Sequence, residues 1–273
     1  KHAVGVRSGT SGLHLAVLAS DVQAGDLVIT TPFSFIASAN CIMFEKAIPV
    51  FVDIDPKTLN IDPALVQKAA HDLKKKGAGA QKWRPPSYRN DLDQIGDLKA
   101  IISVDAFGQP ANYDKLQKIA HNHSLSLIED SCEALGATYK GRKAGTLAEI
   151  GVFAFYPNKQ MTTGEGGMLV TNQDERAALF RSLRNQGRDT FDEWLNHTRL
   201  GYNYRLDEMS AALGLSQLRR IDDLLQARKR VAKWYNTRLS PLPEVQVPFV
   251  SSDTTEMSWF VYVIRVDSRD ARD

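Results

Sequence analysis

Residues 151–171 read G-V-F-A-F-Y-P-N-K-Q-M-T-T-G-E-G-G-M-L-V-T, and the interpretation of the whole chain starts from this stretch. Two apolar runs of strand character, 152–156 and 168–171, enclose a polar loop rich in Gly and Thr. Lys159 lies in that loop, before three glycines that allow the backbone to turn tightly. A lysine beside a packed core can serve as an amine nucleophile, although an isolated loop lysine is more often an ordinary surface residue.

The composition is that of a globular chain without a dominant charge. Of 273 residues 43% are apolar, and 34 Lys+Arg against 32 Asp+Glu give a net charge of +2. This balance argues against a nucleic-acid or anionic membrane surface, and no apolar run approaches membrane-spanning length. Cys41 and Cys132 lie far apart in apolar segments, and there is no signal-peptide pattern, so we expect a soluble, reduced, cytoplasmic protein. His121 and His123 lack further ligands at metal-like spacing, so we predict no metal site.

Helical and strand patterns alternate along the first half of the chain. Such alternation predicts a mostly parallel sheet with helices on both faces. Farther on, we expect Asp207 to cap one long amphipathic helix and an apolar run at 259–264 to form a strand. The expected strands of the first half are 27–30, 49–55, 100–104 and 125–128, and the expected helices start after 12, near 35 and 62, and before 116.

Four features could act together as one binding site. Residues 8–12 read S-G-T-S-G before a helical run, which suits an anion site or an ordinary helix cap. Asp130 follows a buried strand, where open α/β sheets place ligands, and could hold a cationic ring nitrogen or cap a helix. With the aromatic Phe35 and the amine of Lys159, these are the groups that pyridoxal phosphate (PLP) requires.

The chain resembles the DegT/DnrJ/EryC1/StrS family of sugar aminotransferases, which are fold-type-I PLP enzymes. Seven motifs carry the resemblance, in the right order over nearly the whole chain. They are V-R-S-G-T-S-G-L-H-L-A, G-D-L-V-I-T-T-P-F-S-F, P-V-F-V-D-I-D, F-G-Q-P-A-N, L-I-E-D-S-C-E-A-L-G-A, N-K-Q-M-T-T-G-E-G-G and G-Y-N-Y-R-L-D-E-M-S-A-A-L-G. The resemblance implies a large PLP-binding domain with a seven-stranded, mostly parallel sheet (1–215), then a linking helix and the start of a smaller C-terminal α/β domain (216–273), both domains being incomplete.

The resemblance also implies roles for single residues. Lys159 would form the Schiff base with PLP and carry the proton between substrate and cofactor. Asp130 would pair with the pyridinium nitrogen, and Phe35 would stack on the ring.

The phosphate of the cofactor would be held in two ways. Gly9, Thr10 and Ser11 match the family's phosphate cradle within one chain. Asn203 matches an asparagine donated by the neighbouring subunit, so the resemblance implies a homodimer with shared active sites.

Four positions depart from the commonest family pattern. Ala154 replaces a phosphate-binding serine, and Tyr156 replaces a histidine. Glu133 takes the place of a glutamine near the cofactor hydroxyl, where a carboxylate needs a proton or a donor partner. Asp105 replaces a histidine near the end of the preceding strand.

The implied reaction has two halves. L-glutamate would convert the cofactor to pyridoxamine phosphate and leave as 2-oxoglutarate, and the amine would then pass to a keto carbon of a nucleotide-linked deoxyhexose. Three alternatives remain: a sugar dehydratase, a transaminase for small keto acids, and a non-catalytic regulator. In the family's dehydratases a histidine replaces the lysine, so Lys159 argues against that chemistry.

Overall fold

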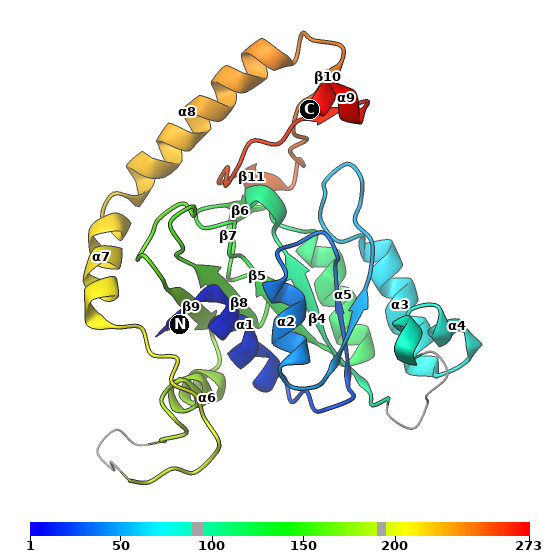
Figure 1. Ribbon diagram of the computed structural model, residues 1–273, viewed down its shortest axis with the longest axis vertical. Helices are drawn as coiled ribbons and strands as arrows, with labels where there is room; N and C mark the ends of the chain where they lie inside the picture. Colours follow the sequence, from blue (N-terminus) through cyan, green and yellow to red (C-terminus); the bar gives the residue numbers. More distant parts are fainter. Residues whose placement is uncertain (89–94, 190–194) are drawn as a thin grey trace.

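A seven-stranded sheet forms the centre of the molecule, in the order β1-β9-β8-β5-β4-β2-β3 (Figure 1). The computed structural model describes residues 1–88, 95–189 and 195–273. The strands of this sheet are β1 (His2–Val6), β2 (Leu27–Thr30), β3 (Ile48–Phe51), β4 (Leu98–Val104), β5 (Ser126–Asp130), β8 (Ile150–Ala154) and β9 (Gly167–Thr171). Five of them run parallel, whereas β9 and β1 are antiparallel to their neighbours. The predicted mostly parallel seven-stranded sheet is therefore confirmed.

Helices cover both faces of this sheet, and each face has its own apolar layer. Successive residues of a strand point to opposite faces, so Ile101 packs in one layer and Ile102 in the other. The layer of Ile101 includes Leu116, and the layer of Ile102 includes Leu15. The helices concerned are α3 (Pro63–Lys75) and α5 (Tyr113–His123) on the first side, and α1 (Gly9–Leu18), α2 (Ala37–Met43) and α6 (Asp174–Arg184) on the second.

The predicted long helix is two helices. α7 (Glu208–Leu218) begins as expected, because Asp207 accepts a hydrogen bond from the backbone N–H of Ser210 at 2.9 Å. The chain then breaks at 219–220 and restarts as α8 (Ile221–Leu239), with two acids in its first turn that favour a new helix start. Within the described ranges, no helix is both long and apolar enough to cross a membrane.

The strand predicted at 259–264 is not formed. Trp259 adopts a left-handed backbone conformation (φ 52°), which a continuous strand does not allow. The side chain of Tyr262 instead stacks on Trp259 and on Tyr235 of α8, with ring centroids 5.8 and 5.0 Å apart. Only 265–266 pair as a strand, β12 (Arg265–Val266), with β10 (Val245–Gln246). Conversely, the strand β1 was not predicted from the sequence, and β3 ends four residues earlier than expected.

The polar segment after α3 is partly packed against that helix. It contains the short helix α4 (Ala78–Gln81), and Trp83 donates its indole N–H to Asp72 of α3 at 2.9 Å. This segment is therefore anchored to α3 at its start, and residues 89–94 lie outside the described residues.

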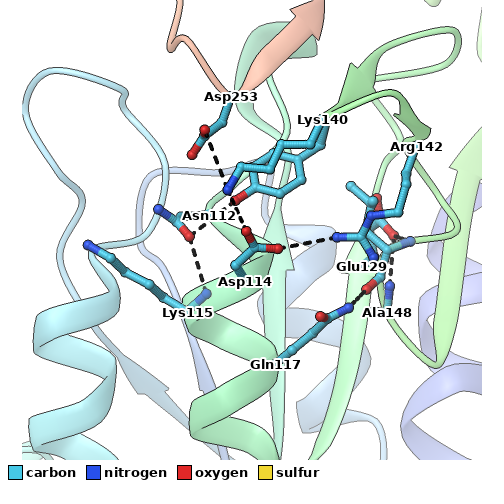
Figure 2. Close-up of polar contacts among 11 residues, drawn as sticks. Asn112, Asp114, Lys115, Gln117, Glu129, Lys140, Arg142, Ala148 and Asp253 are labelled. Carbon is cyan, nitrogen blue, oxygen red and sulfur yellow. Dashed lines mark hydrogen bonds and ion pairs between the residues drawn. The ribbon is translucent and has the colours of Figure 1, made fainter.

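The C-terminal part of the chain joins a smaller three-stranded sheet, in which β11 (Thr254–Glu256) pairs with β6 (Thr138–Tyr139). Beside this pairing, Lys140 contacts Asp114 of α5 at 2.6 Å and Asp253 at 3.6 Å (Figure 2). Arg142 contacts the same Asp114 at 3.3 Å. These contacts bring the residues that follow β11 over the end of the large seven-stranded sheet.

Two buried carboxyl groups, Asp105 and Glu129, lie close together at the ends of β4 and β5. The hydroxyl of Ser131 lies 2.6 Å from Asp105 and 3.0 Å from Glu129. Glu129 also accepts N–H groups of the turn after β7 (Arg142–Lys143), including that of Ala148 (Figure 2), whereas Asp105 accepts the N–H of Ala111. Burial, and then the charge of Glu129, raise the pKa of Asp105 well above its ordinary value. Burial raises the pKa of Glu129 as well, but the N–H groups of Gly145 and Leu147 oppose that rise, so we expect Asp105 to hold the proton of the pair.

Replacing Asp105 by Asn should remove a pH dependence of stability. Because its pKa is raised on folding, the folded state binds more protons, and stability falls as pH rises from the unfolded pKa through the folded one. We expect the native free energy of unfolding to decrease as the pH rises above about 4, the ordinary pKa of an aspartate, and that of Asp105→Asn to decrease less. Asp105→Ala should cost about 1–3 kcal/mol, because it orphans the buried donors. Parallel pH curves from denaturant titrations of the native and Asn proteins would refute the proton assignment.

Candidate active site

A cavity of about 310 Å³ opens where three parallel strands end. Its wall includes the last residues of β4, β5 and β8, namely Val104, Asp130 and Ala154. The carboxyl ends of parallel strands are where such sheets bind ligands, as the sequence predicted for Asp130. Of the eight predicted site residues, six line this cavity: Gly9, Thr10, Phe35, Asp130, Glu133 and Lys159.

The N-terminus of α1 forms one wall. Ser8 caps the helix, because its hydroxyl accepts the N–H of Ser11 at 3.0 Å. The first N–H groups of a helix lack partners within it and carry the positive end of its dipole, so the turn at Gly9 and Thr10 can bind an anion. Ser11 itself is buried, and its hydroxyl lies 2.7 Å from that of Ser8 rather than in the cavity wall. Its side chain is therefore part of the cap, whereas Ser8, which belongs to the predicted anion-site turn at 8–12, lines the cavity.

Close packing holds this helix end against the sheet. A Cβ added at Gly9 would come within 2.7 Å of the Ala154 methyl and 3.0 Å of the Cys132 sulfur. The side chain of Ala154 has no polar atom. On this side of the cavity, the groups that can bind an anion therefore belong to the N-terminus of α1.

Asp130 is held by side chains from another layer of the fold. One of its carboxylate oxygens accepts the hydroxyl of Ser38 on α2 at 2.8 Å, and the other the N–H of Cys132 at 3.3 Å. The next element after Asp130 is the strand β6, and no helix begins directly after this residue. The alternative that Asp130 caps a helix is therefore wrong. Sequence reasoning missed Ser38. One feature of the sequence could have indicated it: Ser38 lies four positions after Ser34, and the two hydroxyl groups are 2.8 Å apart.

Lys159 and Glu133 face each other in the cavity. The ammonium of Lys159 lies 3.7 Å from the Glu133 carboxylate and 4.1 Å from the ring centroid of Phe260. The other carboxylate oxygen of Glu133 accepts the N–H of Phe107 at 2.9 Å. Burial raises the pKa of Glu133, while this N–H and Lys159 oppose the rise. The donor partners that a carboxylate needs at this position are therefore present in the protein.

The two remaining predicted residues occupy different surroundings. Phe35 precedes α2 and lines the cavity, but its side chain is 73% exposed. Asn203 is exposed and does not line the cavity, and its backbone bridges to Asn185. Within the part of the chain that the structure describes, Asn203 is therefore not brought to the same site as Lys159.

A methyl group at Gly9 should displace α1 from the cavity wall. We expect Gly9→Ala to lower the free energy of unfolding by about 1–3 kcal/mol, because its Cβ would overlap Ala154. Adding Ala154→Gly should restore part of that loss, since it removes the overlapping methyl. Denaturant unfolding of both single variants and the double variant measures the coupling. Strict additivity would show that the two residues do not clash.

The chain has extensive similarity to known proteins. The model of the DegT/DnrJ/EryC1/StrS aminotransferase family matches residues 1–273. The chain is 38% identical over 267 residues to the GDP-perosamine synthase of Caulobacter vibrioides, covering 97% of this chain and 65% of that protein. It is 35% identical over 246 residues to the putative pyridoxal phosphate-dependent aminotransferase EpsN of Bacillus subtilis, covering 90% of this chain and 58% of that protein.

Among solved structures, a DegT DnrJ EryC1 StrS aminotransferase from Brucella abortus superposes with a TM-score of 0.87 at 30% identity. The alignment covers 99% of this chain and 67% of that one. The chain thus spans less than two thirds of the length of the two curated relatives named above.

Proposed function

Because the chain belongs to the DegT/DnrJ/EryC1/StrS aminotransferase family, we propose that it moves an amino group from L-glutamate to a keto carbon of a nucleotide-linked deoxy-keto-sugar, with PLP as cofactor. One observation carries the proposal. Lys159, Asp130, Glu133 and the N-terminus of α1 all line a single cavity at the end of the sheet. The similarity to a GDP-perosamine synthase supports a nucleotide-sugar substrate.

The cavity side chains fit the functional groups of PLP. The free N–H groups at Gly9 and Thr10 suit its phosphate, and the carboxylate of Asp130 suits its pyridinium nitrogen. Lys159 supplies an amine for its aldehyde, and the exposed ring of Phe35 supplies a flat apolar face. When bound, the cofactor supplies an electron sink for the substrate carbon that exchanges its proton.

The protein's own residues would then orient the substrate and move the proton. Nζ of Lys159 is the group that takes and returns the proton, since it is the amine in the cavity wall. Glu133, 3.7 Å away, forms an ion pair with that nitrogen when it is protonated and so restrains it. Asp130 stays anchored by Ser38, so its negative charge keeps a fixed position.

Lys159→Ala should abolish amino transfer. We expect the rate with L-glutamate and a nucleotide-linked keto-sugar to fall by at least about 10²–10⁴-fold, the usual contribution of one general acid–base group. Lys143→Ala, which removes an exposed lysine on β7, is the matched control and should leave the rate unchanged. Borohydride reduction with PLP followed by peptide mass analysis should place the cofactor on Lys159. A Lys159→Ala protein that transaminates at the native rate would exclude the proposed role.

The exposed position of Asn203 fits a homodimer in which each subunit completes its neighbour's site. Large apolar side chains are exposed on α2 and α7, including Met43 (58%) and Met209 (84%), as expected of a covered surface. The free cysteines Cys41 and Cys132 suit the proposed cytoplasmic location.

A subunit-mixing experiment tests this arrangement. Lys159→Ala and Asn203→Ala proteins, each impaired alone, should regain activity when unfolded and refolded together. In a mixed dimer one site combines the intact Lys159 of one chain with the intact Asn203 of the other. If both residues act within one chain, mixing yields no gain.

Product analysis separates the remaining alternatives. A transaminase for small keto acids would aminate pyruvate-like acceptors and leave keto-sugars unchanged. A dehydratase would release the sugar without nitrogen, and a regulator would bind no PLP on Lys159.

A further inference from the structure

Arg228, on α8, reaches the backbone of the lysine loop. Its Nη2 donates a hydrogen bond to the carbonyl of Lys159 at 3.0 Å. Its Nη1 donates to the carbonyls of Trp259 and Phe260, at 3.2 and 3.0 Å. Arg228 is half-buried and bonded to three backbone carbonyls of two distant segments, although it lies on the charged side of an amphipathic helix. Burial lowers the pKa of Arg228, so these carbonyls offset the cost of desolvating its charge.

The segment bonded to Arg228 also covers the lysine side chain. The ring of Phe260 lies 4.1 Å from the Lys159 ammonium, and the lysine side chain is only 13% exposed. The backbone N–H of Phe260 donates to the carbonyl of Phe107 at 3.2 Å, and the N–H of Phe107 donates to Glu133. Since Glu133 in turn lies 3.7 Å from the lysine ammonium, these contacts connect Lys159, Phe260, Phe107 and Glu133 in one network.

The backbone conformation of residues 258–260 allows the contacts with Arg228 to form. Trp259 has a positive φ, an uncommon conformation for a bulky residue, which persists only where the surrounding contacts impose it. In this conformation the consecutive carbonyls of Trp259 and Phe260 both reach one nitrogen of Arg228. Ser258 is fixed as well, because its hydroxyl accepts the amide of Gln160, the residue after the lysine, at 2.8 Å.

We propose that Arg228 and Phe260 are positioning residues for Lys159: the guanidinium clamps the lysine loop to the 258–260 segment, and the Phe260 ring restrains the amine against Glu133. This inference rests on the proposed function only in taking Lys159 as the reacting amine. A planar guanidinium can span carbonyls of two segments, whereas an ammonium is a compact point charge, so arginine is specifically required.

The test measures the exposure of the amine itself. Cofactor-free full-length protein is treated briefly with acetic anhydride, and the labelling of Lys159 is compared by peptide mass analysis with that of the exposed Lys143. Arg228→Met and Phe260→Leu should each raise this ratio by about threefold or more, because local opening uncovers Nζ. Arg230→Met, an exposed arginine on the same helix, is the matched control and should leave the ratio unchanged.

Two further readouts distinguish positioning from general destabilisation. Arg228→Lys keeps the charge, but Lys159 should be labelled in it as strongly as in Arg228→Met. Native labelling of Lys159 in Arg228→Lys would show that the planar guanidinium is not required. In the PLP-loaded protein, Arg228→Met should lower kcat with little change in KM for the amino donor. Phe260→Leu keeps an apolar side chain and tests the ring if Arg228→Met fails to fold. Native labelling of Lys159 in both Phe260→Leu and Arg228→Met would refute the proposal.

The labelling result is independent of cofactor chemistry. If labelling responds as expected but PLP does not attach to Lys159, the proposed function fails and the positioning role stands. If PLP attaches and the ratio stays native in both variants, the proposed function stands and the positioning role fails.

Discussion

The parallel pairing of β5 with β4 and β8 is the constraint on which the cavity depends. Its register places Asp130 beside Val104 of β4 and Val152 of β8, so the three strands end together. Because all three run in one direction, the loops that follow them must share one edge of the sheet. The lysine loop after β8 therefore lies next to the acid that ends β5, although 29 positions separate Lys159 from Asp130 along the chain.

Strand alternation gives two neighbouring acids different tasks. Asp130 turns toward α2 and the cavity, where Ser38 holds it. Glu129 turns to the opposite face, where it accepts backbone N–H groups of the turn that precedes β8. Burying two carboxyl groups as close as Glu129 and Asp105 is unfavourable unless one is neutral and the other well hydrogen-bonded. The pair therefore stabilises the connection that leads into β8 and, through it, the start of the lysine loop.

The cavity is completed by segments that a sheet alone does not bring together. The β11–β6 pairing docks the C-terminal part of the chain, and the Lys140–Asp114 ion pair lies beside it. This docking places Phe260 over the lysine, and the crossing of α8 places Arg228 against both. An exposed ion pair such as that of Lys140 contributes little stability, so the backbone pairing of β11 with β6 contributes more to this docking.

Local patterns in the sequence were sufficient for the mostly parallel sheet and for the helix starts at Asp62 and Asp207, because hydrophobic period and capping residues are short-range signals. They also indicated the glycine-rich turn before α1, the strand-end acid Asp130 and the loop lysine, whereas Glu133 was expected from the family resemblance alone. They were not sufficient to find Ser38, the division between α7 and α8, or the irregular backbone at Trp259. Ser38 bonds to Asp130, 92 positions away, and the segment at Trp259 packs on α8 through the stacking of Tyr262 on Tyr235. The sequence by itself therefore determined the fold class and the chemistry-bearing residues. Only the tertiary structure decided that Asp105 is a buried structural acid and that Arg228 contacts the lysine loop, because burial and long-range contact arise when distant segments pack.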